Sequence, residues 1–222
     1  MTVTRRVFVS GAMAAPFLAQ LGGAAPATAS APLDTTFSLL DGLGEIRLTE
    51  LALSRLAAEE IEVQAVAPAT ALLGADGTTV VGVTLPPEYA TGTVNPLGQP
   101  AKGSARVSGG VALQNSKARM EITSIRGSMP EGRISAFLKV DDEWIGEQPL
   151  YAADPSAVRL SVQPGAPGQP TTLKGSGIPI TPTQEGVDAF TEAFGVALFA
   201  VTDRVFTASG TGRAWPLPNL PV

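Results

Sequence analysis

Carboxylates are the side chains that gather densely enough in this sequence to suggest chemistry. The densest cluster is Asp141-Asp142-Glu143, with Glu147 close behind, and four carboxylates could hold Ca²⁺ through oxygen ligands. Glu59-Glu60 is a second pair that could serve in glycoside hydrolysis, but neighbours on a helix do not face each other. Because the Asp-Asp pair separates two apolar alternating segments, we expect a solvated turn between strands rather than a metal site.

Two residue types that most often carry catalysis are missing. The chain has no cysteine and no histidine, which excludes disulfides, thiolate catalysis, Ser-His-Asp chemistry, most zinc and copper sites and histidine ligation of haem. No S-x-x-K segment occurs either, so a serine–lysine hydrolase lacks its motif. We therefore assign no catalytic, cofactor-binding or metal-binding residue, expect no cofactor, and interpret the protein as not an enzyme.

The first 29 residues have the layout of a cleavable export signal. Two adjacent arginines, Arg5-Arg6, precede Phe8 and a moderately apolar segment that ends in small residues near Ala29. The paired arginines and the weak, interrupted hydrophobicity favour the twin-arginine (Tat) pathway over an ordinary Sec signal. The sequence therefore predicts a Tat signal peptide at residues 1–29 and a secreted, extracellular protein.

The charge of the mature chain limits its partners. Cleavage after Ala29 removes two arginines and no acid, which leaves 13 basic and 20 acidic residues and a net charge near −7. Nucleic acid and anionic membranes favour basic patches, so neither is expected as a partner. The expected partner is another protein or a surface polymer, besides the Tat translocase during export.

The mature chain has the pattern of one β-rich domain at residues 37–214. Alternating apolar and polar residues predict strands at residues 119–125, 134–140, 144–150 and 158–162. Asp76-Gly77 between two apolar segments predicts a hairpin. Residues 30–36 are expected to form a flexible mature N-terminus, and the Pro-rich residues 215–222 a tail that cannot join a central strand.

Two short helices interrupt this pattern. Residues 51–60 contain good helix formers. Thr181-Pro182-Thr183-Gln184 predicts a capping box with Thr181 as N-cap, and Gly195 predicts the end of that helix. We expect this second helix to cover one end of the β core.

Glycine and proline predict the breaks between elements. Gly42 and Gly44 predict a turn between two short strands, Phe37–Leu40 and Glu45–Leu48. Residues 86–103 contain repeated prolines and glycines and predict the longest loop. Residues 201–208 predict the last strand.

The order of elements is similar to that of a known group. The segments IEVQAVAPA, SGGVAL, ARMEITS, ISAFLKV and ITPTQEGVDAFTEAFG follow one another after the leader. This resembles small Tat-exported, secreted β-rich proteins of actinobacteria, and distantly the haem-transport-associated surface domains of such bacteria. The resemblance implies a shared fold and secretion. Those domains use tyrosine and histidine at the iron, whereas this chain has no histidine and only Tyr89 and Tyr151 as tyrosines, so no haem residue is carried over.

These observations lead to one interpretation and two alternatives. The fold expected is all-β, an antiparallel sandwich or barrel-like sheet pair with two short helices. The function expected is a secreted non-catalytic binding or structural module, in one version an adaptor subunit of an extracellular protein complex. The alternatives are a carboxylate-based polysaccharide-active enzyme and a haem- or ligand-binding surface domain.

Overall fold

The structure is a computed structural model that describes residues 35–94 and 100–215. Within these residues, thirteen strands and two α-helices follow one another, with a short 3-10 helix before β11. Their bounds in chain order are β1 Thr35–Leu48, α1 Glu50–Ala58, β2 Glu62–Val66, β3 Thr70–Leu73, β4 Val80–Leu85, β5 Pro87–Val94, β6 Pro100–Val107, β7 Gly110–Gln114, β8 Arg119–Met129, β9 Arg133–Val140, β10 Glu143–Ala153, η1 Pro155–Ala157, β11 Arg159–Gln163, β12 Thr171–Pro182, α2 Gln184–Phe194 and β13 Phe206–Trp215.

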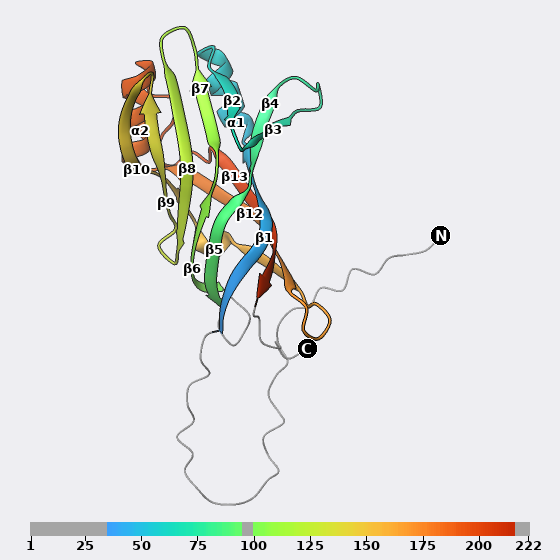
Figure 1. Cartoon of the computed structure of the whole chain (residues 1–222). Coiled ribbons are helices and arrows are strands. Elements are labelled where there is room, and N and C mark those ends of the chain that lie inside the picture. Colours follow the sequence, from blue (N-terminus) through green and yellow to red (C-terminus); the bar gives the residue numbers. More distant parts are fainter. Residues whose placement is uncertain (1–34, 95–99, 216–222) are drawn as a thin grey trace, which may run out of the picture.

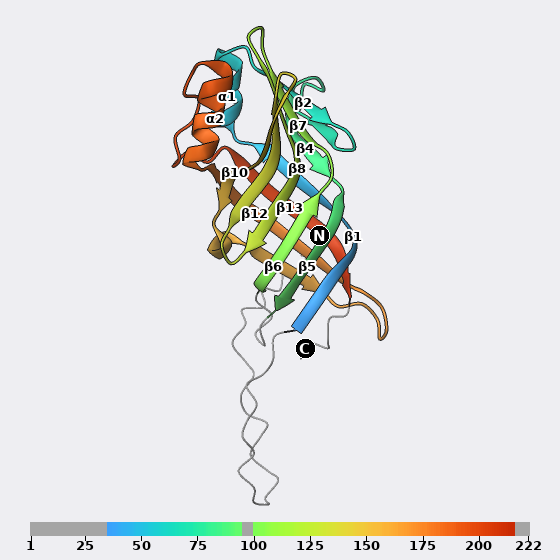
Figure 2. The same ribbon diagram turned by 60° about the vertical axis from the view of Figure 1, so that its left-hand side comes forward.

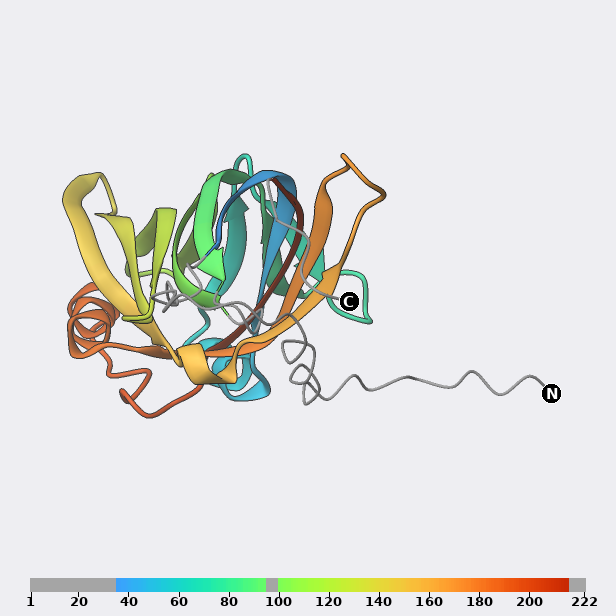
Figure 3. The ribbon, with the colours of Figure 1, turned by 90° about the horizontal axis from the view of Figure 1, so that it is seen from below.

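Eight of the strands close into a ring. Each neighbour pair in the circuit β1-β5-β6-β8-β9-β10-β12-β13 is antiparallel, and β13 returns to pair with β1 along ten residue pairs from Ser38↔Trp215 to Leu48↔Phe206. Seen from below, the strands curve around a common interior (Figure 3). The first and last described strands therefore close the sheet on itself.

The remaining elements are attached to this ring. The β3–β4 hairpin continues from β1, β11 lies beside β12, and β7 joins β8 and carries β2 on its other side. Both helices lie toward the end of the molecule that is uppermost in Figures 1 and 2. This arrangement confirms the all-β, barrel-like antiparallel fold with two short helices.

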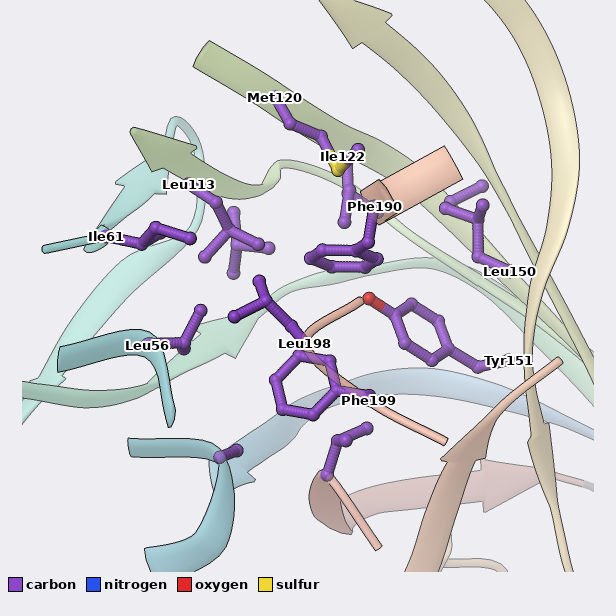
Figure 4. Packing of buried hydrophobic residues seen from close by; sticks show 14 of the residues in the cluster. Leu56, Ile61, Leu113, Met120, Ile122, Leu150, Tyr151, Phe190, Leu198 and Phe199 are labelled. Carbon is purple, nitrogen blue, oxygen red and sulfur yellow. The ribbon is translucent and has the colours of Figure 1, made fainter. Parts of the chain in front are cut away.

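The main core fills the space between the ring and the helices. Figure 4 shows Phe190 of α2, Leu56 of α1 and Tyr151 of β10 converging on one cluster. Leu198 and Phe199, which follow α2, enter the same cluster, and Phe199 meets Phe190 edge to face with ring centroids 5.8 Å apart. The segment after α2 is thus part of the core although it is neither helix nor strand.

No helix within the described residues is both long enough and apolar enough to cross a lipid bilayer.

The turn expected at Gly42 and Gly44 does not form. Instead β1 runs unbroken through both glycines, with one irregularity between Leu39 and Asp41. A Cβ atom at Gly42 would lie 2.6 Å from the carbonyl oxygen of Thr211 on β13. Gly42 therefore permits the close approach of two strand backbones, a common role of glycine within a strand.

The prediction of a long loop at residues 86–103 is also wrong. Most of that segment forms β5 and β6, which pair with each other. Pro87 and Pro100 are the first residues of these two strands, a position where a missing N–H is tolerated.

Two boundaries near the C-terminus are shifted. Thr181 and Pro182 still pair with β10, so β12 extends to Pro182 and the N-cap of α2 is Thr183 rather than Thr181. The last strand begins at Phe206 rather than residue 201, because Ala200–Asp203 forms a hydrogen-bonded turn. Gly195 ends α2 as expected, with φ of 73°.

The first and last described strands extend slightly beyond the predicted domain bounds of residues 37 and 214. Thr35 and Thr36 belong to β1, and Trp215 belongs to β13, where it pairs with Ser38. The predicted signal peptide at residues 1–29, most of the predicted mature N-terminus, and residues 216–222 of the predicted tail lie outside the described residues.

Candidate functional site

A groove of about 890 Å³ lies between α2 and the hairpin of β9 and β10. Helix α2 packs directly against β10 (Figure 1). Carboxylates line the groove on both sides, so we call it the acidic groove. Its lining residues are Lys117, Ala118, Leu138, Val140, Asp141, Asp142, Glu143, Ile145, Gln148, Glu185, Asp188, Ala189, Glu192 and Ala193.

The helix side of the groove is set by the two faces of α2. Phe190 and Phe194 are buried in the core, and this fixes the rotation of the helix. Glu185, Asp188 and Glu192 are spaced by three and four residues, so they share one face beside the groove. The amphipathic helix thus packs its apolar face on the sheet and presents a row of three carboxylates.

The N-terminus of α2 is fixed by Thr183. Its hydroxyl oxygen accepts a hydrogen bond from the Gly186 N–H at 3.0 Å and donates one to the Pro149 carbonyl oxygen at 2.5 Å. The N-cap therefore ties the start of the helix to β10.

The hairpin side is a two-residue turn at Asp141-Asp142, between the paired residues Val140 and Glu143. Asp141 has φ of 52° and makes two hydrogen bonds to the backbone of Arg119 on β8. Its N–H donates to the Arg119 carbonyl oxygen at 2.7 Å, and its side-chain Oδ1 accepts from the Arg119 N–H at 2.9 Å. Two-residue hairpins favour Asp in this left-handed conformation. The predicted turn between strands is confirmed.

The floor of the groove is apolar and its rim is strongly negative. Leu138 and Ala118 are buried beneath it. Six carboxylates line the groove against one lysine, Lys117. A second lysine, Lys139, reaches Asp142 from outside the lining, with 3.4 Å between Nζ and Oδ1. The groove therefore offers apolar contact beneath a field that attracts cations.

Two large apolar side chains stand beside the hairpin turn. Trp144 is 65% exposed and Ile145 is 46% exposed. Tryptophan is enriched among the residues that dominate the energy of protein–protein interfaces. Ile145 lines the groove, whereas Trp144 lies opposite Lys139 on β9 and outside the groove lining. Ile145 therefore adds an exposed apolar surface to the groove.

The structure separates some carboxylates that the sequence suggested together. Asp141, Asp142 and Glu143 lie on the groove rim, whereas Glu147 reaches Arg126 at 3.7 Å and does not line the groove. Glu59 is the C-cap of α1 and Glu60 follows it. Within the described residues, no group of three or more acidic side chains is placed to hold a metal ion.

The three acidic residues of α2 that line the groove, Glu185, Asp188 and Glu192, were not recognised from the sequence as part of a site. Their spacing in the helix is a visible signal, but nothing in the pattern of either segment says that α2 packs beside the Asp141-Asp142 turn. That juxtaposition depends on the pairing of β10 with β12 immediately before the helix.

The two tyrosines have different environments. Tyr89 on β5 is 40% exposed. Tyr151 is buried, burial raises the pKa of its phenol, and its hydroxyl has no hydrogen-bond partner within the described residues. In Figure 4 this hydroxyl points toward Phe190 and Leu198. A phenol kept neutral in this way is poorly suited to act as a tyrosinate ligand.

Comparison with known proteins shows a likeness of fold. No protein-family model matches the chain, and no curated protein matches it either. Among solved structures, the C-terminal domain of HtaA from Corynebacterium glutamicum is similar, with a TM-score of 0.50 and 11% identity over 80% of this chain and 99% of that chain. The distant resemblance expected from the sequence therefore extends to the fold, and at this identity to the fold alone.

Proposed function

We propose that this protein is a secreted, non-catalytic binding module whose acidic groove docks a cationic amphipathic segment of a partner protein. The observation that carries the proposal is the groove, in which two carboxylate rows flank an apolar floor. A segment with lysine or arginine on one side and apolar residues on the other would match both features. Helical segments of this kind commonly bind in apolar grooves of partner proteins.

Charge complementarity distinguishes a cationic partner from other proteins. Opposite charge across an interface speeds association and rejects like-charged partners. Exposed Ile145, which lines the groove, would add apolar contact at the hairpin edge. The proposal also agrees with the acidic composition of the mature chain.

A designed peptide pair tests the proposal. A fluorescein-labelled helical peptide of leucine and lysine should bind the mature protein in an anisotropy titration. The same peptide with glutamate in place of lysine should not bind. Binding should weaken as salt rises from about 0.05 M to 0.5 M, because the Debye length falls across this range.

A matched pair of charge reversals locates the contact. Asp188→Lys with Glu192→Lys should abolish binding of the lysine peptide, since both carboxylates line the groove. Glu62→Lys with Glu131→Lys makes the same change of net charge at exposed positions away from the groove and should leave binding within about twofold. Equal loss in both variants would mean that net charge alone attracts the peptide, and the groove would not be the site.

Export through the Tat pathway is the second part of the proposal. It rests on Arg5-Arg6 and the leader that follows. Replacing Arg5-Arg6 with Lys-Lys should abolish appearance of the protein in culture fluid, measured by immunoblot of cell and medium fractions. Unchanged export would assign the leader to another pathway.

The haem alternative does not fit the residues present. The chain has no histidine. Tyr151 points its neutral hydroxyl into an apolar cluster, and Tyr89 lies on a different strand. We therefore derive no haem chemistry, and a shift of the Soret band on adding haemin to the pure protein would overturn this.

The enzyme alternative requires a carboxyl group that stays protonated near neutral pH. Asp76, Asp154 and Asp203 instead have their pKa lowered by hydrogen bonds, chiefly from Thr79, Ser156 and the Ala200 N–H respectively. These three carboxyls are unsuited to general-acid catalysis. Activity of the mature protein on a panel of polysaccharides would contradict the non-catalytic proposal.

A further inference from the structure

The interior of the strand ring contains an apolar cavity of about 190 Å³. Seven of the eight ring strands contribute to its wall: β1, β6, β8, β9, β10, β12 and β13. We call it the ring cavity. It is separate from the acidic groove, and no residue lines both.

The ring cavity exists because small residues occupy inward-facing positions on adjacent strands. Gly127 of β8 lies directly opposite Ala105 of β6 on one side and Ile134 of β9 on the other, and all three line the cavity. Directly opposite residues project from the same face of a sheet. A Cβ atom at Gly127 would meet no atom within 4 Å, so the missing side chain leaves space.

The wall of the ring cavity offers few hydrogen-bonding groups to a water molecule. Of its lining residues, only Glu45, Tyr151 and Ser209 carry polar side chains. The Glu45 carboxylate is paired with Arg47, an exposed residue of the same strand face. A buried water needs two to four polar partners, whereas an apolar cavity of about 150 Å³ stays dry and takes up benzene.

We propose that the ring cavity is a binding site for a small hydrocarbon, of the size of a monocyclic aromatic ring with one or two additional carbons. An eight-stranded ring has an interior that is either just filled by side chains or holds one small ligand. Here glycine and alanine replace the side chains that would fill it. This site is a further function, independent of the acidic groove.

Toluene is a probe of the right class and size. In a ¹³C-methyl spectrum of the mature protein, toluene should shift the signals of the five isoleucines of the cavity wall in a saturable way: Ile46, Ile122, Ile125, Ile134 and Ile180. The signal of Ile145, which lies in the acidic groove, should not move. Absence of saturable shifts at the wall, or shifts at Ile145 alone, would overturn the proposal.

A pair of leucine substitutions gives an independent test. Gly127→Leu places a side chain in the cavity and should weaken toluene binding by about tenfold or more, because the leucine occupies the ligand's space. Ser128→Leu adds the same side chain on the next residue, which faces away from the cavity in an alternating strand, and should bind as the wild type does. If folded Gly127→Leu binds toluene as tightly as the wild type does, the ring cavity is not the binding site. If Gly127→Leu does not fold, the wild-type methyl shifts still decide the question.

Discussion

At the scale of single residues, Tyr151 is the least satisfied group in the core. Tyr151 is 6% exposed, its ring meets Phe206 edge to face at 5.3 Å, and its hydroxyl has no hydrogen-bond partner among the residues that the structure describes. Tyr151→Phe keeps the ring and removes a buried unpaired hydroxyl. We expect the free energy of unfolding to rise by about 1 kcal/mol, measured by urea denaturation.

Tyr89→Phe is the control for this change. Its ring is 40% exposed, so its hydroxyl is open to water and its removal should leave stability within about 0.5 kcal/mol. A large loss of stability in Tyr151→Phe would mean that the hydroxyl has a partner in solution.

Asp203 makes a contribution to the free energy of unfolding that depends on pH. Its carboxylate accepts hydrogen bonds from the Ala200 N–H at 2.8 Å and from Arg55 of α1 at 2.5 Å, and these contacts lower its pKa. A carboxyl whose pKa is lowered by folding stabilises the protein above its unfolded pKa of about 4, and this contribution is lost as the pH falls through the folded pKa. Asp203→Asn should therefore lower the free energy of unfolding by about 1 kcal/mol at pH 7.

The pH dependence separates this effect from a loss of packing. Urea titrations at successively lower pH should bring wild type and Asp203→Asn together below about pH 4. A difference that stays constant down to pH 3 would contradict the assignment. Asp142→Asn removes an exposed carboxylate paired with Lys139 at 3.4 Å and should change stability little.

At the scale of elements, the N-cap of α2 attaches the helix that forms one side of the acidic groove to β10. Thr183→Ala removes the N-cap hydroxyl and its bond to the Pro149 carbonyl. We expect a loss of about 1–2 kcal/mol in the free energy of unfolding, measured by urea denaturation. Thr181→Ala, at the cap position expected from the sequence, should cost less because Thr181 pairs within the sheet through its backbone. A larger loss of stability in Thr181→Ala than in Thr183→Ala would show that Thr181 is the N-cap.

This helix also shows how far sequence reasoning reaches. The glycine stop of α2 and the Asp141-Asp142 turn follow from local pattern, and both were predicted. The cap was misplaced by two residues because Thr181 and Pro182 are held by a strand that lies far away in the sequence. Local preference is overridden there by pairing with β10.

The continuous first strand is a second example of the same limit. Gly42 is typical of a turn when the sequence is considered alone, but in the structure it faces the backbone of β13 at the other end of the chain. The acidic groove was not predicted for the same reason: each carboxylate row is visible in the sequence, whereas the packing of α2 beside the Asp141-Asp142 turn is not.

At the scale of the whole molecule, the pairing of β1 with β13 closes the ring. The two strands are separated by nearly the whole described chain, so forming this contact is costly in chain entropy. Leu43 and Thr211 lie directly opposite each other on these strands and both are exposed. Because the chain has no cysteine, a disulfide introduced at this pair would be the single cross-link.

We expect Leu43→Cys with Thr211→Cys to raise the free energy of unfolding by up to about 4 kcal/mol when oxidised, because the link constrains the unfolded chain over a very long loop. Urea denaturation with and without dithiothreitol measures the effect within one protein, and reduction should return the midpoint toward that of the wild type. Leu43→Cys alone controls for the lost leucine. Failure of the thiols to join under mild oxidation would mean that β1 and β13 are not neighbours, and the ring that encloses the cavity would be open.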